Sequence, residues 1–426
     1  MPMADSAIAW NRAGTSAGNH IAAARRLLRA LRVGAPVLVA ATFNMVLCFL
    51  NTRGIAISVI DIELAEVVII GTVLFISRRV ILEHMLIVLV ILFAYLCVHW
   101  MFIGEVDPKI VRDLLIPFAF FALGRSLADQ EDADRIVYAL LLLVLAVALF
   151  EWLSLATFLR YFDVIAYYVD KGAVQVAQTQ YLANHLFVSG MRPEGRSLFP
   201  VLGDHRVSSI FLEPVSAGNF AAIAFFWIAC RFRTRPLTNT VFALVCGALI
   251  VLADARFAAA VAIVTVLAQV SPIARWRGAL IALPALVVLL VLGAAWKLDG
   301  TIIDDSLIGR FDGSGMLLWS FTPLQWLGLA SADAATVDSG YAYLLSSLGV
   351  LGAAALWLVF VAPPATTPQA RLLRSCIASY AALSLSVSAS MFTIKTAALL
   401  WFLYGAANNG GRIAPTSFTV RSARHK

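Results

Sequence analysis

Charged residues are scarce in this chain, since Asp, Glu, Lys and Arg make up only 13% of its 426 residues. An ordinary soluble domain carries about 25% charged residues. Hydrophobic residues make up 61% of the chain, so a soluble globule could not cover them with polar surface. We therefore expect a polytopic membrane protein. The net charge of +7 is interpreted through its distribution about the membrane, and no nucleic-acid partner is expected.

Several common chemical signatures are also missing. The five cysteines all fall in apolar runs, which argues against a disulfide framework and a thiolate metal site. His185 and His205 are too isolated to hold a metal, so no metal site and no cofactor are predicted. The chain has no Walker-type phosphate loop, no HExxH and no GxSxG motif. The missing phosphate loop argues against a nucleotide-driven pump.

What the chain does have is long apolar stretches. A helix that crosses a bilayer needs about 20 mostly apolar residues, and we find twelve candidate stretches. We predict an all-α fold, a polytopic transmembrane protein of about 12 spans with two large loops on the outer face. The predicted spans are 34–50, 55–76, 80–100, 111–124, 136–158, 211–230, 237–253, 257–270, 279–296, 341–361, 372–390 and 396–407.

The placement of Lys and Arg predicts the orientation. With the N-terminus inside, most of the basic residues fall in cytoplasmic loops and tails, as the positive-inside rule requires. An even number of spans then places both termini in the cytoplasm and both long loops, about 160–210 and 297–340, outside. The predicted organisation is a basic amphipathic lead (1–33), a single transmembrane domain (34–410) and a basic tail (411–426).

Three carboxylates, Asp61, Glu63 and Glu66, open the second predicted span. An ionisable residue at membrane depth is costly and marks either a pair or a functional site. These carboxylates either pair with basic residues or form an acidic lining of an outward-open cavity. The basic residues available at that face are Arg53, Lys109 and Arg112.

The segment from His205 to Pro214 closes the longest polar stretch and leads into an apolar run. Pro214 sits where a helix can start, because the first turn has unpaired N–H groups. Glu213 either satisfies those donors or presents a charge at the mouth of a membrane cavity. In a second turn, between two apolar spans, Arg256 either anchors to headgroups or clamps a phosphate bidentately.

Four polar islands follow one another in a recognisable order. They are Arg206 with Ser208 and Ser209 before Glu213-Pro214, then Asp254-Ala255-Arg256-Phe257, Gly309-Arg310-Phe311, and Asp338-Ser339-Gly340-Tyr341 followed by Gly349 and Gly352. With the span pattern, they resemble the Wzy-type polysaccharide polymerases and their O-antigen ligase relatives. Within that group the chain is most similar to exopolysaccharide polymerases of the xanthan-gum type. The ligase branch typically has a histidine in the second long loop, which is absent here and favours the polymerase.

The resemblance implies glycosyl transfer on the periplasmic face of a bacterial inner membrane. A growing glycan on undecaprenyl pyrophosphate would move onto a newly flipped lipid-linked repeat unit, with other polysaccharide export or chain-length proteins as further partners. Arginines would neutralise the leaving pyrophosphate, and a carboxylate or imidazole would serve as general base. The predicted substrate-binding residues are Arg206, Arg256, Arg310 and Tyr341. The candidates for the catalytic base are Glu213, Asp338 and His205.

Three alternatives stay open from the sequence. An O-antigen ligase-type transferase would use the same lipid pyrophosphate. A secondary transporter or lipid flippase would also explain twelve spans and buried charges, but its inverted repeats and broken helices in matching halves are not found. A structural partner of an export machine would make the polar islands dispensable.

Overall fold

The computed structural model describes residues 30–81, 83–127, 129–172, 190–191, 199–203, 205–271, 276–298, 300, 306–330, 339–363, 365 and 367–409. These residues are almost entirely helical, and the only β-type contact among them is a single bridge between Met191 and His205. The predicted all-α class is therefore confirmed for the described chain.

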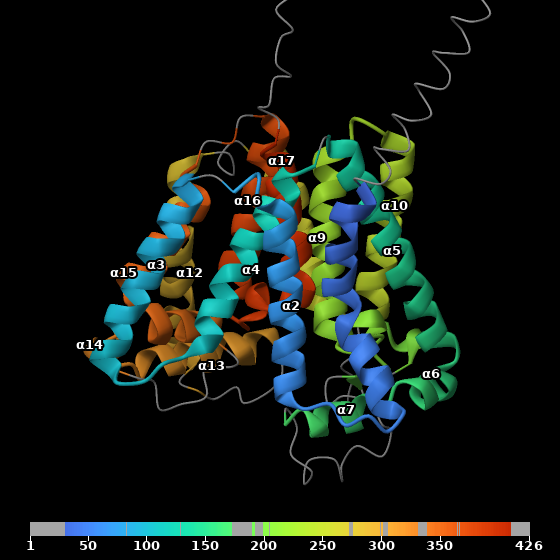
Figure 1. Ribbon diagram of the computed structural model, residues 1–426, viewed down its shortest axis with the longest axis horizontal. Coiled ribbons are helices and arrows are strands. Elements are labelled where there is room, and N and C mark those ends of the chain that lie inside the picture. The colour runs from blue at the N-terminus through green and yellow to red at the C-terminus, as the bar shows by residue number, and fades with distance from the viewer. Residues whose placement is uncertain are drawn as a thin grey trace, which may run out of the picture.

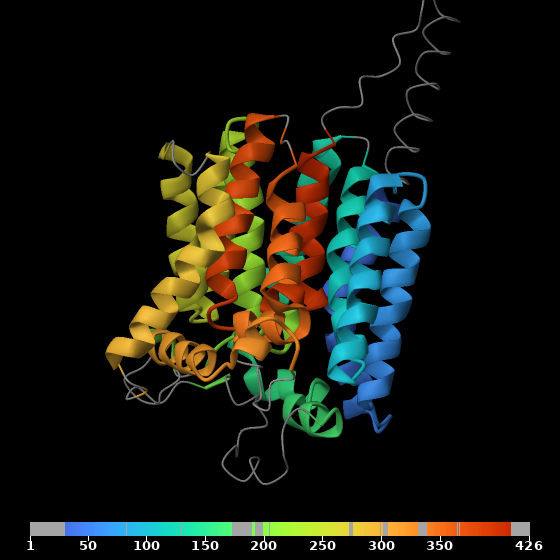
Figure 2. The same ribbon diagram turned by 90° about the vertical axis from the view of Figure 1, so that its left-hand side faces the viewer.

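Most of the long helices run side by side along one axis (Figure 1). They are Ala30–Thr52, α2 (Val59–Ser77), α3 (Glu83–Ile103), α4 (Pro108–Arg125), α5 (Gln130–Leu153), α9 (Pro214–Arg231), α10 (Pro236–Leu252), α11 (Arg256–Val270), α12 (Arg277–Leu298), α15 (Gly340–Val361), α16 (Pro368–Ser384) and α17 (Ile394–Ala407). Shorter helices lie across the lower end of this bundle, as Figures 1 and 2 show. They are α6 (Leu155–Tyr161), α7 (Val164–Asp170), α13 (Leu307–Trp319) and α14 (Pro323–Trp326).

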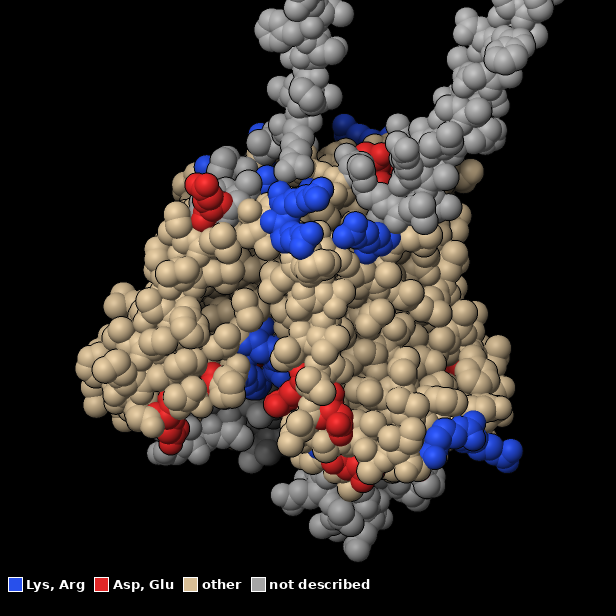
Figure 3. All heavy atoms as spheres, viewed as in Figure 1, with Lys and Arg blue, Asp and Glu red and all other residues tan. Residues whose placement is uncertain are grey.

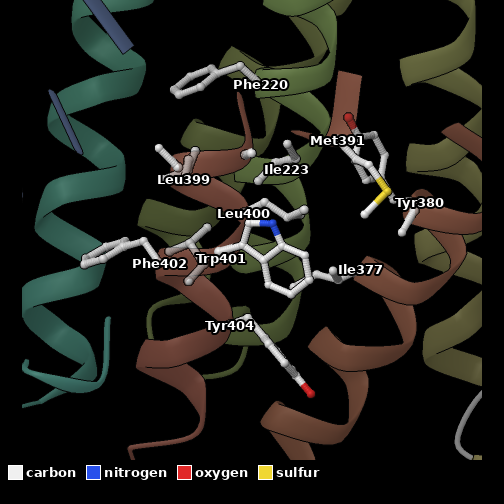
Figure 4. Packing of buried hydrophobic residues seen from close by; sticks show 14 of the residues in the cluster. Phe220, Ile223, Ile377, Tyr380, Met391, Leu399, Leu400, Trp401, Phe402 and Tyr404 are labelled. Carbon is white, nitrogen blue, oxygen red and sulfur yellow. The ribbon is translucent and has the colours of Figure 1, made fainter. Parts of the chain in front are cut away.

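Helix α17 forms the core of the bundle. All of its residues are buried, which is the pattern of a helix that is apolar on every side. Figure 4 shows its side chains, among them Leu400 and Trp401, packed between Phe220 of α9 and Ile377 of α16. On another face α17 meets α4 backbone to backbone. A Cβ added to Gly405 would lie 2.1 Å from the carbonyl oxygen of Phe121, so only glycine permits this approach.

Five helices of the described chain are long and apolar enough to cross a membrane, which supports a membrane-embedded protein. Three of the five are Ala30–Thr52, Met85–Ile103 and Gln130–Leu153, and the other two are α12 and α15. Shorter apolar helices include α10, α11 and α17. Each of the twelve predicted stretches lies largely on a helix, but two predicted ends are wrong. Helix α5 ends at Leu153, before the short α6, and α16 ends at Ser384, before an irregular link to α17.

The two ends of the bundle differ in charge. The described chain enters at Ala30 and leaves after Ala407 at the same, upper end in Figure 1. Basic side chains gather along that upper edge in Figure 3. Lower down, basic and acidic atoms lie together in a groove between the α3–α15 side of the molecule and α2. The charged groups of interest for chemistry are therefore found toward the lower end.

Candidate active site

The first turns of α9 are the point where several distant segments meet. Glu213 is the N-cap residue, but its side chain makes no capping hydrogen bond to a backbone N–H of the first turn, contrary to one of its two sequence interpretations. Its Oε2 instead accepts hydrogen bonds from Ser216 Oγ at 2.7 Å and from Lys395 Nζ at 2.5 Å. The Lys395 side chain is only 8% exposed, whereas that of Glu213 is 29% exposed. The carboxylate thus remains accessible while its partner is enclosed.

An irregular link between α16 and α17 completes this meeting point. It contains the 3-10 turn η6 (Ser390–Phe392) and delivers Lys395 to the first turn of α17. Asn219, one turn further along α9 than Ser216, donates to Ser390 Oγ at 3.3 Å. Glu213, Ser216, Asn219, Ser390 and Lys395 form a polar cluster that we call the α9 site. In a membrane protein, non-helical backbone of this kind is tolerated where it lines a cavity or is buried in protein.

Arg206 lies beside this region, and its guanidinium donates hydrogen bonds to carbonyl groups at the C-terminal end of α10. Nε donates to the carbonyl of Ala253 at 3.1 Å, and Nη2 lies 3.4 Å from the carbonyl of Asp254. The neighbouring Val207 N–H donates to the carbonyl of Leu252 at 3.0 Å. These are carbonyls that the C-terminus of α10 leaves without helical partners. Arg206 is 5% exposed, so its main contacts are structural.

A buried carboxylate organises the segment that carries Arg206. Glu151, near the end of α5, has no exposed surface and accepts from the backbone N–H groups of Ser208 and Ser209 at 3.0 and 2.6 Å. It also accepts from Ser208 Oγ at 2.9 Å. His205 Nε2 is 3.1 Å from Glu151 Oε1, but no hydrogen bond of good geometry joins them. His205 therefore lies against the carboxylate of Glu151.

Arg256 differs from Arg206 in its contacts. It is the first residue of α11 and is half-buried, and its Nε is enclosed with no acceptor among the described residues. The turn before it packs tightly against α9, because a Cβ on Gly218 would lie 2.1 Å from that of Ala255. Asp254 in this turn has a positive φ of 44°. Close packing therefore holds Arg256 near the beginning of α9.

The remaining predicted residues divide into three cases. Arg310, on α13, has Nη1 3.5 Å from the carbonyl of Val387, so it reaches the link between α16 and α17. Tyr341 is buried, and its hydroxyl donates to the carbonyl of Ala382 at 2.8 Å, which ties α15 to α16. Asp338 lies outside the described residues.

A second charged network adjoins the α9 site. Arg112 of α4 pairs with Glu66 of α2 at 2.8 Å and with its neighbour Asp113 at 2.8 Å. Asp113 in turn accepts from the hydroxyl of Tyr343 at 2.8 Å. Glu66 also interacts electrostatically with Lys395. The paired interpretation of Glu66 is therefore confirmed, and the same pairing extends the cluster of charges toward α4.

Helix α7 lies beside the α9 site. The ammonium of Lys171, just after α7, stands 3.6 Å from the ring centroid of Tyr168. Burial is the main reason that the pKa of Lys171 is lowered to about 7, and the charge of Lys395 lowers it further. The charge of Glu213 acts in the opposite direction. Lys171 therefore lies close enough to interact electrostatically with both Glu213 and Lys395.

Two residues of this region were missed from the sequence. Lys395 and Glu151 are each the sole charged residue in a long apolar stretch. The rule that an ionisable residue at membrane depth marks a pair or a functional site would have identified both. Their partners could not be found in this way, because they lie 182 and 57 positions away along the chain.

The site offers a carboxylate, several cations and hydroxyl groups toward one end of a helical bundle. Such a set can neutralise an anionic group and accept a proton from a hydroxyl. Comparison of the chain with known protein families, with characterised proteins and with solved structures gives no match. The functional argument therefore depends on the residues themselves.

Proposed function

We propose that this protein is a membrane glycosyltransferase that joins lipid-pyrophosphate-linked repeat units into a polysaccharide, in the manner of the Wzy-type polymerases. The observation that carries the proposal is the pairing of Glu213 with Lys395 at the first turn of α9. The turn that precedes Arg256 packs against Gly218 in the same helix. The lower end of the bundle would face the periplasm of a bacterial inner membrane, with both termini in the cytoplasm.

In the proposed reaction, the carboxylate and the cations of the site have different roles. The acceptor hydroxyl oxygen bonds to the anomeric carbon of the donor glycan, and the bond from that carbon to the pyrophosphate oxygen breaks. The hydroxyl proton passes to a carboxylate, for which Glu213 is the described candidate. Asp338 remains the second candidate for this role. The electron pair leaves on the lipid pyrophosphate, which needs only charge neutralisation.

Arg256, Lys395 and Arg206 make different contacts, so we assign them different roles. Arg256 is the best candidate to grip the pyrophosphate, because its Nε has no acceptor among the described residues and guanidinium binds phosphate bidentately. Lys395 can exchange its bond with Glu213 for the leaving anion as the proton reaches the carboxylate. Arg206 would act indirectly, by holding the turn that precedes Arg256.

The proposal is tested by lipid-linked glycan analysis in a deletion strain that carries each variant. Arg256→Ala and Glu213→Gln should abolish polymer while the single lipid-linked repeat unit accumulates on the outer face. Arg256→Lys should retain part of the activity, because it keeps the charge but loses the bidentate fork. Arg233→Ala, an exposed arginine after α9, is the matched control and should polymerise normally.

Two results would count against a polymerase. Full-length chains from folded Arg256→Ala and Glu213→Gln proteins would remove the α9 site from the chemistry. A repeat unit trapped on the cytoplasmic leaflet would instead indicate a flippase.

A further inference from the structure

A large apolar cavity lies at the opposite end of the bundle from the α9 site. Its volume is about 920 Å³, and it is bounded by α3, α4, α15 and α17. The lower part of its wall is apolar and includes Val88, Phe118, Phe121 and Val359. Ligand-binding cavities have volumes of about 300–1,000 Å³, so this one is at the upper end of that range.

The rim of this cavity is polar and basic. Arg125 is the last residue of α4, Asn408 and Asn409 follow α17, and Pro363 follows α15, so all four lie at the upper end of the bundle. Asn408 Nδ2 donates to the carbonyl of Tyr404 at 2.8 Å, and Asn409 donates to the carbonyl of Leu127. The amide side chains are thus fixed in place around the rim, and Arg125 contributes a permanent positive charge.

The cavity extends from this rim into the apolar depth of the bundle. On α4 its wall runs from Arg125 to Pro117, which is about 12 Å along a helix that rises 1.5 Å per residue. A hydrocarbon core is about 30 Å thick, so the cavity reaches well into one leaflet. Val359 is 38% exposed and Leu358 is 43% exposed, so the wall formed by α15 is open to the surroundings of the bundle.

We propose that this cavity binds a phospholipid with an anionic headgroup. The phosphate lies at Arg125 on the rim, and an acyl chain fills the apolar depth. The charge of Arg125 and the apolar wall match the two parts of such a lipid, and basic pockets between transmembrane helices at the cytoplasmic side are suited to anionic headgroups. In the orientation proposed above, the lipid comes from the cytoplasmic leaflet and stays separate from the reacting groups.

The binding is tested on the full-length protein, purified in detergent and reconstituted in nanodiscs of phosphatidylcholine. Phosphatidylglycerol is titrated in, and bound lipid is counted by native mass spectrometry. Val359→Trp should place a bulky ring in the wall of the cavity, obstruct the acyl chain and reduce bound phosphatidylglycerol at least tenfold. Leu351→Trp, at a 71% exposed position of the same helix, is the matched control and should bind as the wild type does.

The charge at the rim is tested separately. Arg125→Gln should weaken phosphatidylglycerol binding about fivefold, with no change for phosphatidylcholine. The same change at Arg78, an exposed residue after α2, should have no effect. If Val359→Trp does not fold, fluorescence quenching by brominated phosphatidylglycerol replaces it, and the expected result is a component of wild-type quenching that Trp401→Phe, in the cavity wall, loses.

Three outcomes would overturn the proposal. Unchanged lipid binding in a folded Val359→Trp protein would place the lipid elsewhere. Equal binding of phosphatidylcholine and phosphatidylglycerol by the wild type would remove the role of Arg125. Co-purification of a polyprenyl phosphate that phosphatidylglycerol cannot displace would assign the cavity to the prenyl chain of a substrate.

Discussion

The Nζ atom of Lys395 lies 2.5 Å from Oε2 of Glu213, across 182 positions of the chain. This pair joins the N-cap of α9 to the first turn of α17, the buried core helix. It therefore connects the stability of the bundle to the chemistry proposed for its lower end. Because Lys395 is more deeply buried than Glu213, the loss of either partner should change the free energy of unfolding by a different amount.

Removing one partner should destabilise the fold by different amounts. Glu213→Gln leaves the enclosed ammonium of Lys395 without its counter-charge and should cost about 3 kcal/mol. Lys395→Met leaves a carboxylate that is 29% exposed to solvent, so its cost should be smaller, about 1–2 kcal/mol. Thermal unfolding in detergent, followed by fluorescence, measures both values.

The double variant Glu213→Gln/Lys395→Met is the control for this pair. It removes both charges together, so its cost should be less than the sum of the single costs. Additive costs would show that the two side chains do not stabilise each other.

The carboxylate of Glu151 should be required for the local conformation of residues 205–212. Three donors converge on it, and Ser209 and Leu212 have positive φ values of 51° and 58°. Glu151→Gln would turn an amide toward N–H groups and should cost about 3 kcal/mol. Limited proteolysis should then cleave near His205, whereas Glu131→Gln at the exposed, opposite end of α5 should leave the pattern unchanged. Equal protection of both variants would contradict this role.

The positions of the helices could be predicted from the sequence, because length and apolar composition are local properties. Each predicted stretch lies largely on a helix of the described chain. The end at Phe158 was wrong because α5 stops at Leu153 and the apolar sequence continues into α6. The end at Ser390 was wrong because α16 stops at Ser384 and the link that follows, which mixes serines with apolar residues, leaves the α-helix before the 3-10 turn η6.

The site could be predicted only in part. Glu213, Arg206 and Arg256 were selected as residues of interest, and α9 and the turn before α11 do bring their segments together. The different contacts of the two arginines depend on where the C-terminus of α10 lies, which no pattern in the sequence gives. The pairing of Lys395 with Glu213 likewise depends on tertiary packing between α9 and α17.

The close contact of α4 with α17 should not tolerate a methyl group. A Cβ on Gly124 would lie 2.0 Å from the carbonyl oxygen of Phe402, a distance that forces the helices apart. Gly124→Ala should therefore lower the free energy of unfolding by about 3 kcal/mol. Gly247→Ala on α10 has nothing within 4 Å of the added Cβ and should be neutral or stabilising by up to about 1 kcal/mol. A smaller loss at Gly124 than at Gly247 in the same unfolding assay would contradict this packing.

The amine of Lys171 should titrate near neutral pH. Burial and the charge of Lys395 lower its pKa from 10.5 to about 7. Lys395→Met should raise this pKa, since it removes a like charge, and Glu213→Gln should lower it further. Reductive ¹³C-methylation followed by NMR titration in detergent measures the shift, and the Lys171→Arg protein identifies the resonance by its absence.

The same shift predicts how stability depends on pH. Between about pH 7 and 10.5 the unfolded chain holds a proton on Lys171 that the folded chain has released, so this residue makes stability rise with pH over that window. Below pH 7 both states are protonated and the dependence ends. The melting temperature of the wild type relative to Lys171→Met should therefore increase from pH 7 to pH 10. A constant difference across that range would show that the folded and unfolded states bind this proton equally.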